Sequence, residues 1–183
     1  MKLHHTLLAS AALLAAFATQ AQTVSVSPIH TDVTLGDTFS VAILATGFPD
    51  KIFGGGYNLA FDPSILQVDA IAIRASWEFA RSAGLLDAAS GTVNDIYFNT
   101  FVAPINGDFL TASVTFKAIG AGTSAITLSE SPSFPFGNEF GDPVAISYVS
   151  GSATVAAVPE PSSLALLMAG LGGMALVTRR RRN

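Results

Sequence analysis

The sequence contains no cysteine, and histidine is almost as scarce. A domain without disulfide bonds depends for its stability on its hydrophobic core alone. Two of the three histidines lie within the first five residues, so His30 is the only one in the rest of the chain. Zinc requires three or four nitrogen or sulfur ligands, which such a chain cannot supply. We therefore exclude a zinc site, and we interpret His30 as a surface residue because no nucleophile elbow accompanies it.

Positive charge is also scarce between the two ends of the chain. The whole sequence has nine lysine and arginine residues against thirteen acidic ones. Lys2, the arginines at 179–182 and Glu160 lie at the termini, which leaves four basic and twelve acidic residues, a formal charge of −8. A surface of this charge repels nucleic acid, so we exclude that class of partner. It would repel an acidic polysaccharide as well, unless a divalent cation bridged the two.

The first 21 residues have the order of a secretory signal peptide. Lys2 supplies the positive charge, and the apolar stretch from Leu7 to Phe17 is short for a hydrocarbon core about 30 Å thick. Small residues follow as far as Ala21, and cleavage there would leave Gln22 as the new N-terminus. We therefore expect a signal helix over residues 1–21 that signal peptidase removes during export.

The C-terminal segment combines a proline-flanked acid, an uncharged run and an arginine cluster. Prolines on both sides of Glu160 keep this backbone extended and accessible to a processing enzyme. The uncharged run from Ser162 to Thr178 has 17 residues, about 26 Å as a helix, which predicts a short or temporary transmembrane helix. Basic flanks stay on the cytoplasmic side of a membrane. The motif is Pro159, Glu160 and Pro161, and the membrane stop is Arg179, Arg180, Arg181 and Arg182.

These three parts, in this order, resemble the PEP-CTERM sorting signal. The resemblance covers residues 158–183 and implies handling by an exosortase, a membrane transpeptidase-like enzyme of bacteria that make exopolysaccharide. It implies an inner-membrane intermediate with the middle of the chain on the periplasmic side, followed by the cell surface or extracellular matrix. A simple tail anchor with a proline-rich linker is the alternative.

The segment between the two signals has the period-two patterning of β-strands. Its clearest alternation places Leu110, Ala112, Val114 and Phe116 on one face, which we expect to lie in the core. Turns are expected at residues 47–50 and 120–122.

Two other local features are predicted in this segment. We expect a short helix over Ser76–Leu86. We interpret Gly54–Gly56 as a loop with positive φ, because a phosphate-binding loop would need a lysine that is absent.

Four segments resemble cohesin-type domains, the nine-stranded jelly rolls known from cellulose-degrading assemblies. They are residues 35–41, 57–66, 110–116 and 121–128. The resemblance implies an all-β, jelly-roll β-sandwich of about nine strands over residues 22–157. It also implies binding of dockerin modules, or of carbohydrate in the wider superfamily. The region around Trp77 departs from the shortest cohesin pattern, so a dockerin-binding face is not carried over residue by residue.

Two further signals concern ligands. Asn138, Glu139 and Asp142 place oxygen atoms in a glycine-rich loop, which suits calcium, although the spacing matches no EF-hand and a solvated turn is the alternative. Aromatic residues are the second signal, since a group of them would form an exposed platform for sugar rings or plug the end of a sandwich. The group consists of Trp77, Phe79, Phe134, Phe136 and Phe140.

Three classes of function follow from these observations. The preferred one is a non-catalytic surface or matrix protein whose sandwich binds another protein. The second is a carbohydrate-binding module attached to exopolysaccharide, and the third is a glycoside hydrolase, which needs two facing carboxylates in a cleft. A flat polar and aliphatic sheet face would favour the first class, and a row of exposed aromatic residues the second. We predict no catalytic residue and no cofactor other than calcium.

Overall fold

The computed structural model describes residues 22–158 and 170–171, and the following account concerns these residues. The predicted signal peptide, the PEP motif and the arginine cluster lie outside them. Within the described part no helix is long and apolar enough to span a membrane. The described chain is built of strands, and only Gly170 and Leu171 are helical.

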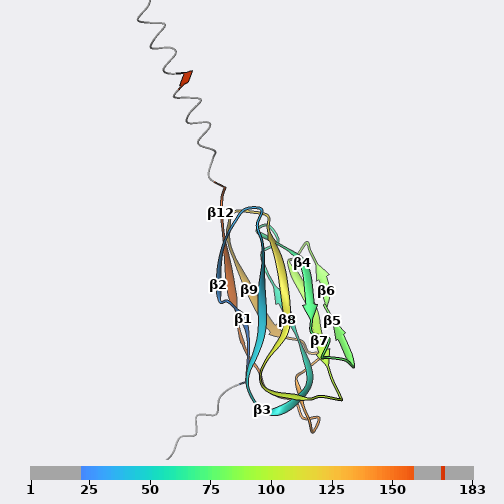
Figure 1. Cartoon of the computed structure of the whole chain (residues 1–183). Coiled ribbons are helices and arrows are strands. Elements are labelled where there is room, and N and C mark those ends of the chain that lie inside the picture. The colour runs from blue at the N-terminus through green and yellow to red at the C-terminus, as the bar shows by residue number, and fades with distance from the viewer. Residues whose placement is uncertain (1–21, 159–169, 172–183) are drawn as a thin grey trace, which may run out of the picture.

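The strands follow one another with short connections (Figure 1). They are β1 (Thr23–Ser27), β2 (His30–Thr34), β3 (Thr38–Ala60), β4 (Leu66–Ile73), β5 (Ala80–Ser82), β6 (Leu85–Asp87), β7 (Thr92–Asn99), β8 (Ile105–Ala118), β9 (Gly122–Glu130), β10 (Gly137–Asn138), β11 (Ser147–Val149) and β12 (Gly151–Ala156).

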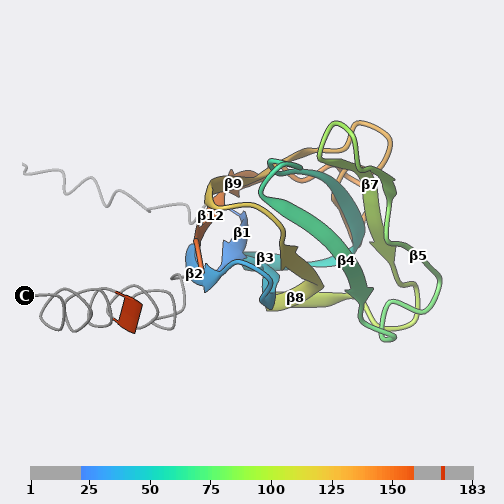
Figure 2. The same cartoon turned by 90° about the horizontal axis from the view of Figure 1, so that it is seen from above.

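The long strand β3 takes part in both layers of a sandwich. Its first part pairs with β1 and β8, and its last part pairs with β7 and β9. One layer therefore has the order β4-β8-β3-β1-β11, and the other has the order β2-β12-β9-β3-β7, with β5 and β6 beyond β7. Seen from above, β3 and β8 lie on one side of the core, and β9 and β7 on the other (Figure 2). The predicted all-β sandwich is confirmed.

The predicted turn at residues 47–50 is wrong, because β3 continues through it. The ladder with β8 persists on both sides of this segment, where Phe48 pairs with Gly107 and Ile52 with Ile105. Register shifts on either side of Phe48, together with a φ of 76° at Gly47, show that the strand bends here instead of ending.

The predicted helix over Ser76–Leu86 is also wrong. That segment contains β5 and β6, which add to the free edge of β7. Gly84 lies between them with a φ of 81°, a left-handed conformation that interrupts a helix and that glycine adopts freely. Pairing with an open strand edge thus outweighs the local helical pattern.

The alternation predicted in β8 is confirmed over most of the strand. Ala112, Val114 and Phe116 are fully buried. Leu110, however, is half-exposed, and Thr111 is buried instead. A register shift after the Ile43–Ala112 pair inserts one extra residue into β8, and such a β-bulge reverses the phase of the side chains beyond it.

Buried hydroxyl groups connect the two layers at this bulge. Thr111 Oγ1 donates to the carbonyl oxygen of Ile43 at 2.9 Å and lies 2.9 Å from the Tyr57 hydroxyl. Burial raises the pKa of Tyr57 well above its ordinary value, so this phenol stays neutral. Among the residues described, the hydrophobic core extends from Val24 to Val155.

Candidate functional site

Two surfaces of the sandwich differ in their chemistry. The first is the outer side of the layer β4-β8-β3-β1, termed here the flat face. The strand register aligns Ser27, Ala42, Ser113 and Ala72 in one row across all four strands. The flat face consists of Ser25, Ser27, Ser40, Ala42, Leu44, Ala70, Ala72, Leu110, Ser113 and Thr115, all at least partly exposed.

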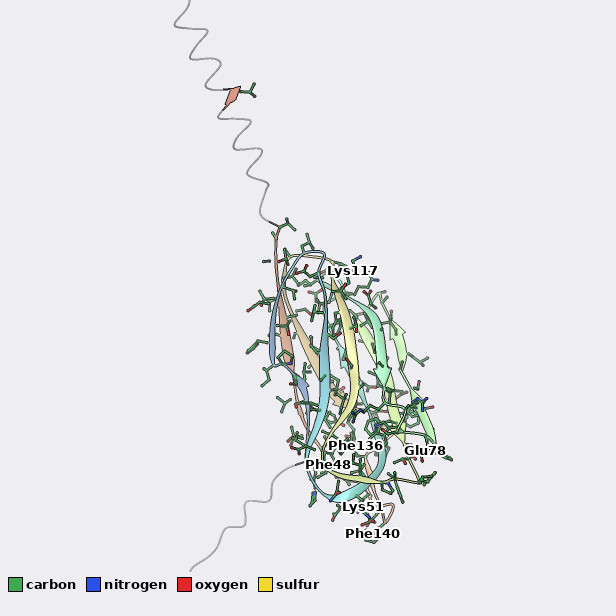
Figure 3. The ribbon with its side chains drawn as sticks, viewed as in Figure 1. Phe48, Lys51, Glu78, Lys117, Phe136 and Phe140 are labelled. Atoms are coloured by element: carbon green, nitrogen blue, oxygen red, sulfur yellow. The ribbon has the colours of Figure 1, made fainter. Side chains whose placement is uncertain are left out.

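The flat face has small or aliphatic side chains and no aromatic ring. Ser40 and Thr115 face each other across β3 and β8, with 2.8 Å between their hydroxyl oxygens. Lys117, one of the few basic residues, lies at the end of β8 beside Gln67 of β4 and is exposed (Figure 3). The result is a polar and aliphatic surface. At the end that carries Lys117, the exposed Asp69 also contacts Gln67, with 3.4 Å between its Oδ1 and the Gln67 Nε2.

The second surface is a groove of about 430 Å³ over β3 and β7, termed the aromatic groove. Its floor depends on the glycine run of β3. The prediction of a loop with positive φ at Gly54–Gly56 is wrong, because these residues pair with β7 and none of them has a positive φ. Glycine is required there because neighbouring atoms, including the backbone carbonyl oxygen of Phe98 at Gly54, occupy the space that a Cβ atom would need.

Gly55 and Gly56 make room for side chains on opposite sides of the sheet. A Cβ atom at Gly55 would lie 2.5 Å from the buried ring of Phe136, on the core side. A Cβ atom at Gly56 would lie 2.8 Å from the Cβ of Phe134, on the side of the groove. The run thus admits Phe136 to the core and lets Phe134 pack closely against the outer side of β3.

Aromatic rings form the walls of the groove. Tyr97 and Phe134 are stacked with 4.1 Å between ring centroids. On the opposite wall Phe101 contacts both Phe53 and Phe79, with centroid distances of 5.5 and 4.4 Å. Phe79 and Phe101 are 64% and 55% exposed, so their rings are available to a ligand.

The predicted aromatic platform is therefore corrected. Trp77 and Phe136 are 3% and 2% exposed because they plug one end of the core, where both pack against Phe98. Phe140 is 77% exposed and is not among the residues that line the groove, and it lies at the tip of the molecule (Figure 3). Of the predicted residues, Phe79 and Phe134 do line it.

Sequence reasoning missed Asn99 of the groove and three of its aromatic residues. These aromatic residues are Phe53, Tyr97 and Phe101. The only signal available was their aromatic character, since the pairing of β3 with β7 that brings them together is not visible in the sequence.

Glu78 fixes the wall that carries Phe101. Its carboxylate accepts hydrogen bonds from the Thr100 hydroxyl at 2.8 Å and from the backbone amides of Phe101 and Val102 at 3.1 Å. These bonds, with that of Thr100 first, lower the pKa of Glu78 to about 2. The side chain therefore stays ionised and holds the loop after β7 in place.

The predicted calcium ligands lie on the loop that includes β10. Asn138 Oδ1 already accepts hydrogen bonds from the backbone amides of Phe140 and Asp142, at 3.0 and 2.9 Å. No group of three or more acidic, histidine or cysteine side chains is placed to hold a metal among the residues described. Calcium binding by Asn138, Glu139 and Asp142 stays a prediction, and a turn held by Asn138 accounts for the geometry.

The exposed titratable groups include His30 and three hydrogen-bonded carboxylates. His30 is an exposed surface residue whose Nδ1 lies 2.8 Å from the hydroxyl of Ser152. Accepted hydrogen bonds lower the pKa values of Asp62, Glu78 and Asp87. A general acid in a glycosidase needs a raised pKa, which is the opposite direction.

The sandwich has the fold of cohesin domains. A type I cohesin–dockerin complex from Clostridium thermocellum matches with a TM-score of 0.63 at 15% identity, over 75% of this chain and 95% of that one. A non-cellulosomal cohesin from Archaeoglobus fulgidus matches with a TM-score of 0.60 at 14% identity, over 78% and 95% of the two chains. The third cohesin of ScaC from Acetivibrio cellulolyticus, in complex with the ScaB dockerin, gives 0.59 at 22%, over 73% and 98%.

The C-terminal segment carries a PEP-CTERM protein-sorting motif over residues 157–182. This confirms the sorting signal predicted from the sequence. A search of curated proteins finds no match to the chain.

Proposed function

We propose that this chain is an exported, non-catalytic display protein whose sandwich binds a protein partner through the flat face. The observation that carries this proposal is a polar and aliphatic sheet surface without aromatic residues on a cohesin fold. Solved relatives of this fold occur in complexes with dockerins.

The partner would carry acidic groups opposite Lys117 and apolar groups opposite Leu44 and Leu110. Both leucines are half-exposed and pair with each other in the register of β3 and β8. A central apolar contact with a charged rim is the usual anatomy of a protein interface. The formal charge of −8 over the domain makes the basic Lys117 a distinctive point of recognition.

The sorting tail supplies the route by which the domain reaches its partner. Signal peptidase would release residues 1–21, and the segment from Ser162 to Thr178 would hold the chain in the inner membrane. An exosortase-type enzyme would then act at the motif around Glu160, which frees the domain of residues 22–157 for the cell surface or extracellular matrix. The PEP-CTERM match supports this route.

Site-specific photo-crosslinking in the producing cells tests the proposal. A photoreactive amino acid replaces Ser113 at the centre of the flat face, and Thr127 of β9 serves as the matched control. Thr127 is an exposed strand residue of the other layer. We expect a discrete protein adduct from position 113 that is absent from position 127. Equal adducts from both positions, or none from either, would contradict the proposal.

A further inference from the structure

The aromatic groove has the features of a second binding site, on the layer that does not carry the flat face. Two strongly exposed rings, Phe79 and Phe101, lie 4.4 Å apart at an angle of 72°. The opposite wall is the stacked pair of Tyr97 and Phe134. Large exposed apolar side chains around a groove are typical of ligand-binding sites.

One residue that lines this groove has a buried polar atom without a partner. Asn99 lines the groove, and its Oδ1 is buried and accepts no hydrogen bond from the described protein. Buried acceptors are nearly always satisfied, so an unpartnered one calls for a donor from outside the chain. A ligand with hydroxyl or N–H groups would supply it.

The groove is also neutral. None of the side chains that line it carries a charge, although the domain as a whole has a formal charge of −8. An anionic ligand would approach against this field, and a cationic one would find no carboxylate in the groove to pair with it. The chemistry therefore favours a neutral ligand with both apolar faces and hydroxyl groups.

An extended peptide fits the groove poorly because the strand edge that is open beside it is short. β7 pairs with β3 along one side and with β5 and β6 along the other. The outer edge of β5 is open, but this strand has only three residues, Ala80–Ser82, with which a peptide could pair. What the groove offers is ring faces and one acceptor, and a pyranose ring matches both.

We propose that the aromatic groove binds neutral saccharide units of a polysaccharide. The C–H face of a pyranose ring would lie on Phe79 or Phe101, since the negative face of an aromatic ring attracts such hydrogens. A sugar hydroxyl would donate to Asn99 Oδ1. This site is independent of the flat face, so the two proposals stand or fall separately.

Titration of the 22–158 domain with oligosaccharides tests the inference. The probes are neutral hexaoses of glucose (β-1,4 and β-1,3), mannose, galactose and xylose, followed by calorimetry and by NMR shifts of the Asn99 side-chain amide. Oligogalacturonate is the anionic comparison. We expect at least one neutral hexaose to bind and to shift the Asn99 signals, and we expect no binding of oligogalacturonate.

Variants locate the binding. Phe101→Ala and Asn99→Leu should each weaken it about tenfold, through loss of a ring face or of the acceptor. Phe79→Ala, at a more exposed position, gives the same test if either of the others fails to fold. Phe140→Ala is the matched control, because its ring is exposed but outside the groove, and it should bind as the parent does. Failure of every neutral hexaose to bind, equal binding by Phe79→Ala and the parent, or preference for a peptide would overturn the inference.

Discussion

Aromatic residues near one end of the sandwich divide into two groups that only the structure separates. Phe136 and Trp77 fill the core beside Phe98, whereas Phe79 and Phe101 remain exposed on the walls of the groove. The division depends on Gly55, which makes room for Phe136 on the inner side of β3. Composition and spacing indicate an aromatic cluster, but they do not indicate which of its rings face the core.

Replacing Gly55 by alanine should destabilise the domain. The added Cβ atom would lie 2.5 Å from Cγ of the buried Phe136 ring, and overpacking of this kind costs about 1–3 kcal/mol. Urea unfolding measures the change. Gly137→Ala is the matched control, since nothing lies within 4 Å of its Cβ position. Equal unfolding midpoints for the two variants would contradict this account of the glycine run.

The ionisation of Glu78 should make the free energy of unfolding depend on pH. The pKa of Glu78 is about 2 in the folded protein and near its ordinary value of 4.5 when unfolded. A depressed folded pKa means that this stabilisation is complete above about pH 4.5 and is lost as the pH falls towards 2. Thermal unfolding of the parent and Glu78→Gln from pH 7 to pH 2.5 should show the two curves converging in this window. Parallel curves would show that Glu78 does not hold the loop.

At the scale of strands, the features predicted correctly are those that local periodicity determines. The prediction that Ala112, Val114 and Phe116 of β8 face the core was correct, because alternation over a regular strand indicates which side is buried. The bulge at Thr111 and the bend of β3 near Phe48 were missed, since both depend on the partner strand. The prediction of a helix at Ser76–Leu86 was wrong for the same reason, because β5 and β6 pair with the edge of β7.

The buried hydroxyl group of Thr111 at the bulge should stabilise the domain. Thr111→Val removes the bonds to Ile43 and Tyr57 and leaves a buried phenol with one partner fewer, at a cost of about 1–3 kcal/mol. Thr115→Val on the same strand is the control. Its hydroxyl is on the exposed flat face, so the change should stay within about 0.5 kcal/mol. Urea unfolding compares the two, and a similar loss in both would exclude the proposed role of the bulge.

At the scale of the whole molecule, two unlike surfaces lie on one cohesin-like sandwich followed by a sorting tail. The fold class and the tail were predictable, because turn motifs and the order of proline, apolar run and arginines are local in the sequence. The flat face and the aromatic groove were not, because each gathers residues from strands far apart in the chain. Both proposed binding surfaces therefore depend on strand pairing more than on any motif in the domain.

The sorting tail gives a prediction for the producing cells. Replacement of Pro159, Glu160 and Pro161 by alanine removes the motif that a processing enzyme would engage. The chain should then accumulate in the membrane fraction at a higher mass than the parent. Immunoblots of membrane and matrix fractions measure this, with Ser163→Ala as a control. Normal release of the triple variant would contradict the proposed route.

Retention of the purified 22–158 domain on the producer's extracellular matrix tests the central claim most directly. The domain carries Phe79→Ala and Phe101→Ala, so that the groove does not contribute, and it is applied with and without calcium. We predict that retention is lost after the matrix proteins are digested and also when Ser113→Arg is added, but not when Thr127→Arg is added. Retention that survives digestion and is unaffected by Ser113→Arg would contradict binding of a protein through the flat face.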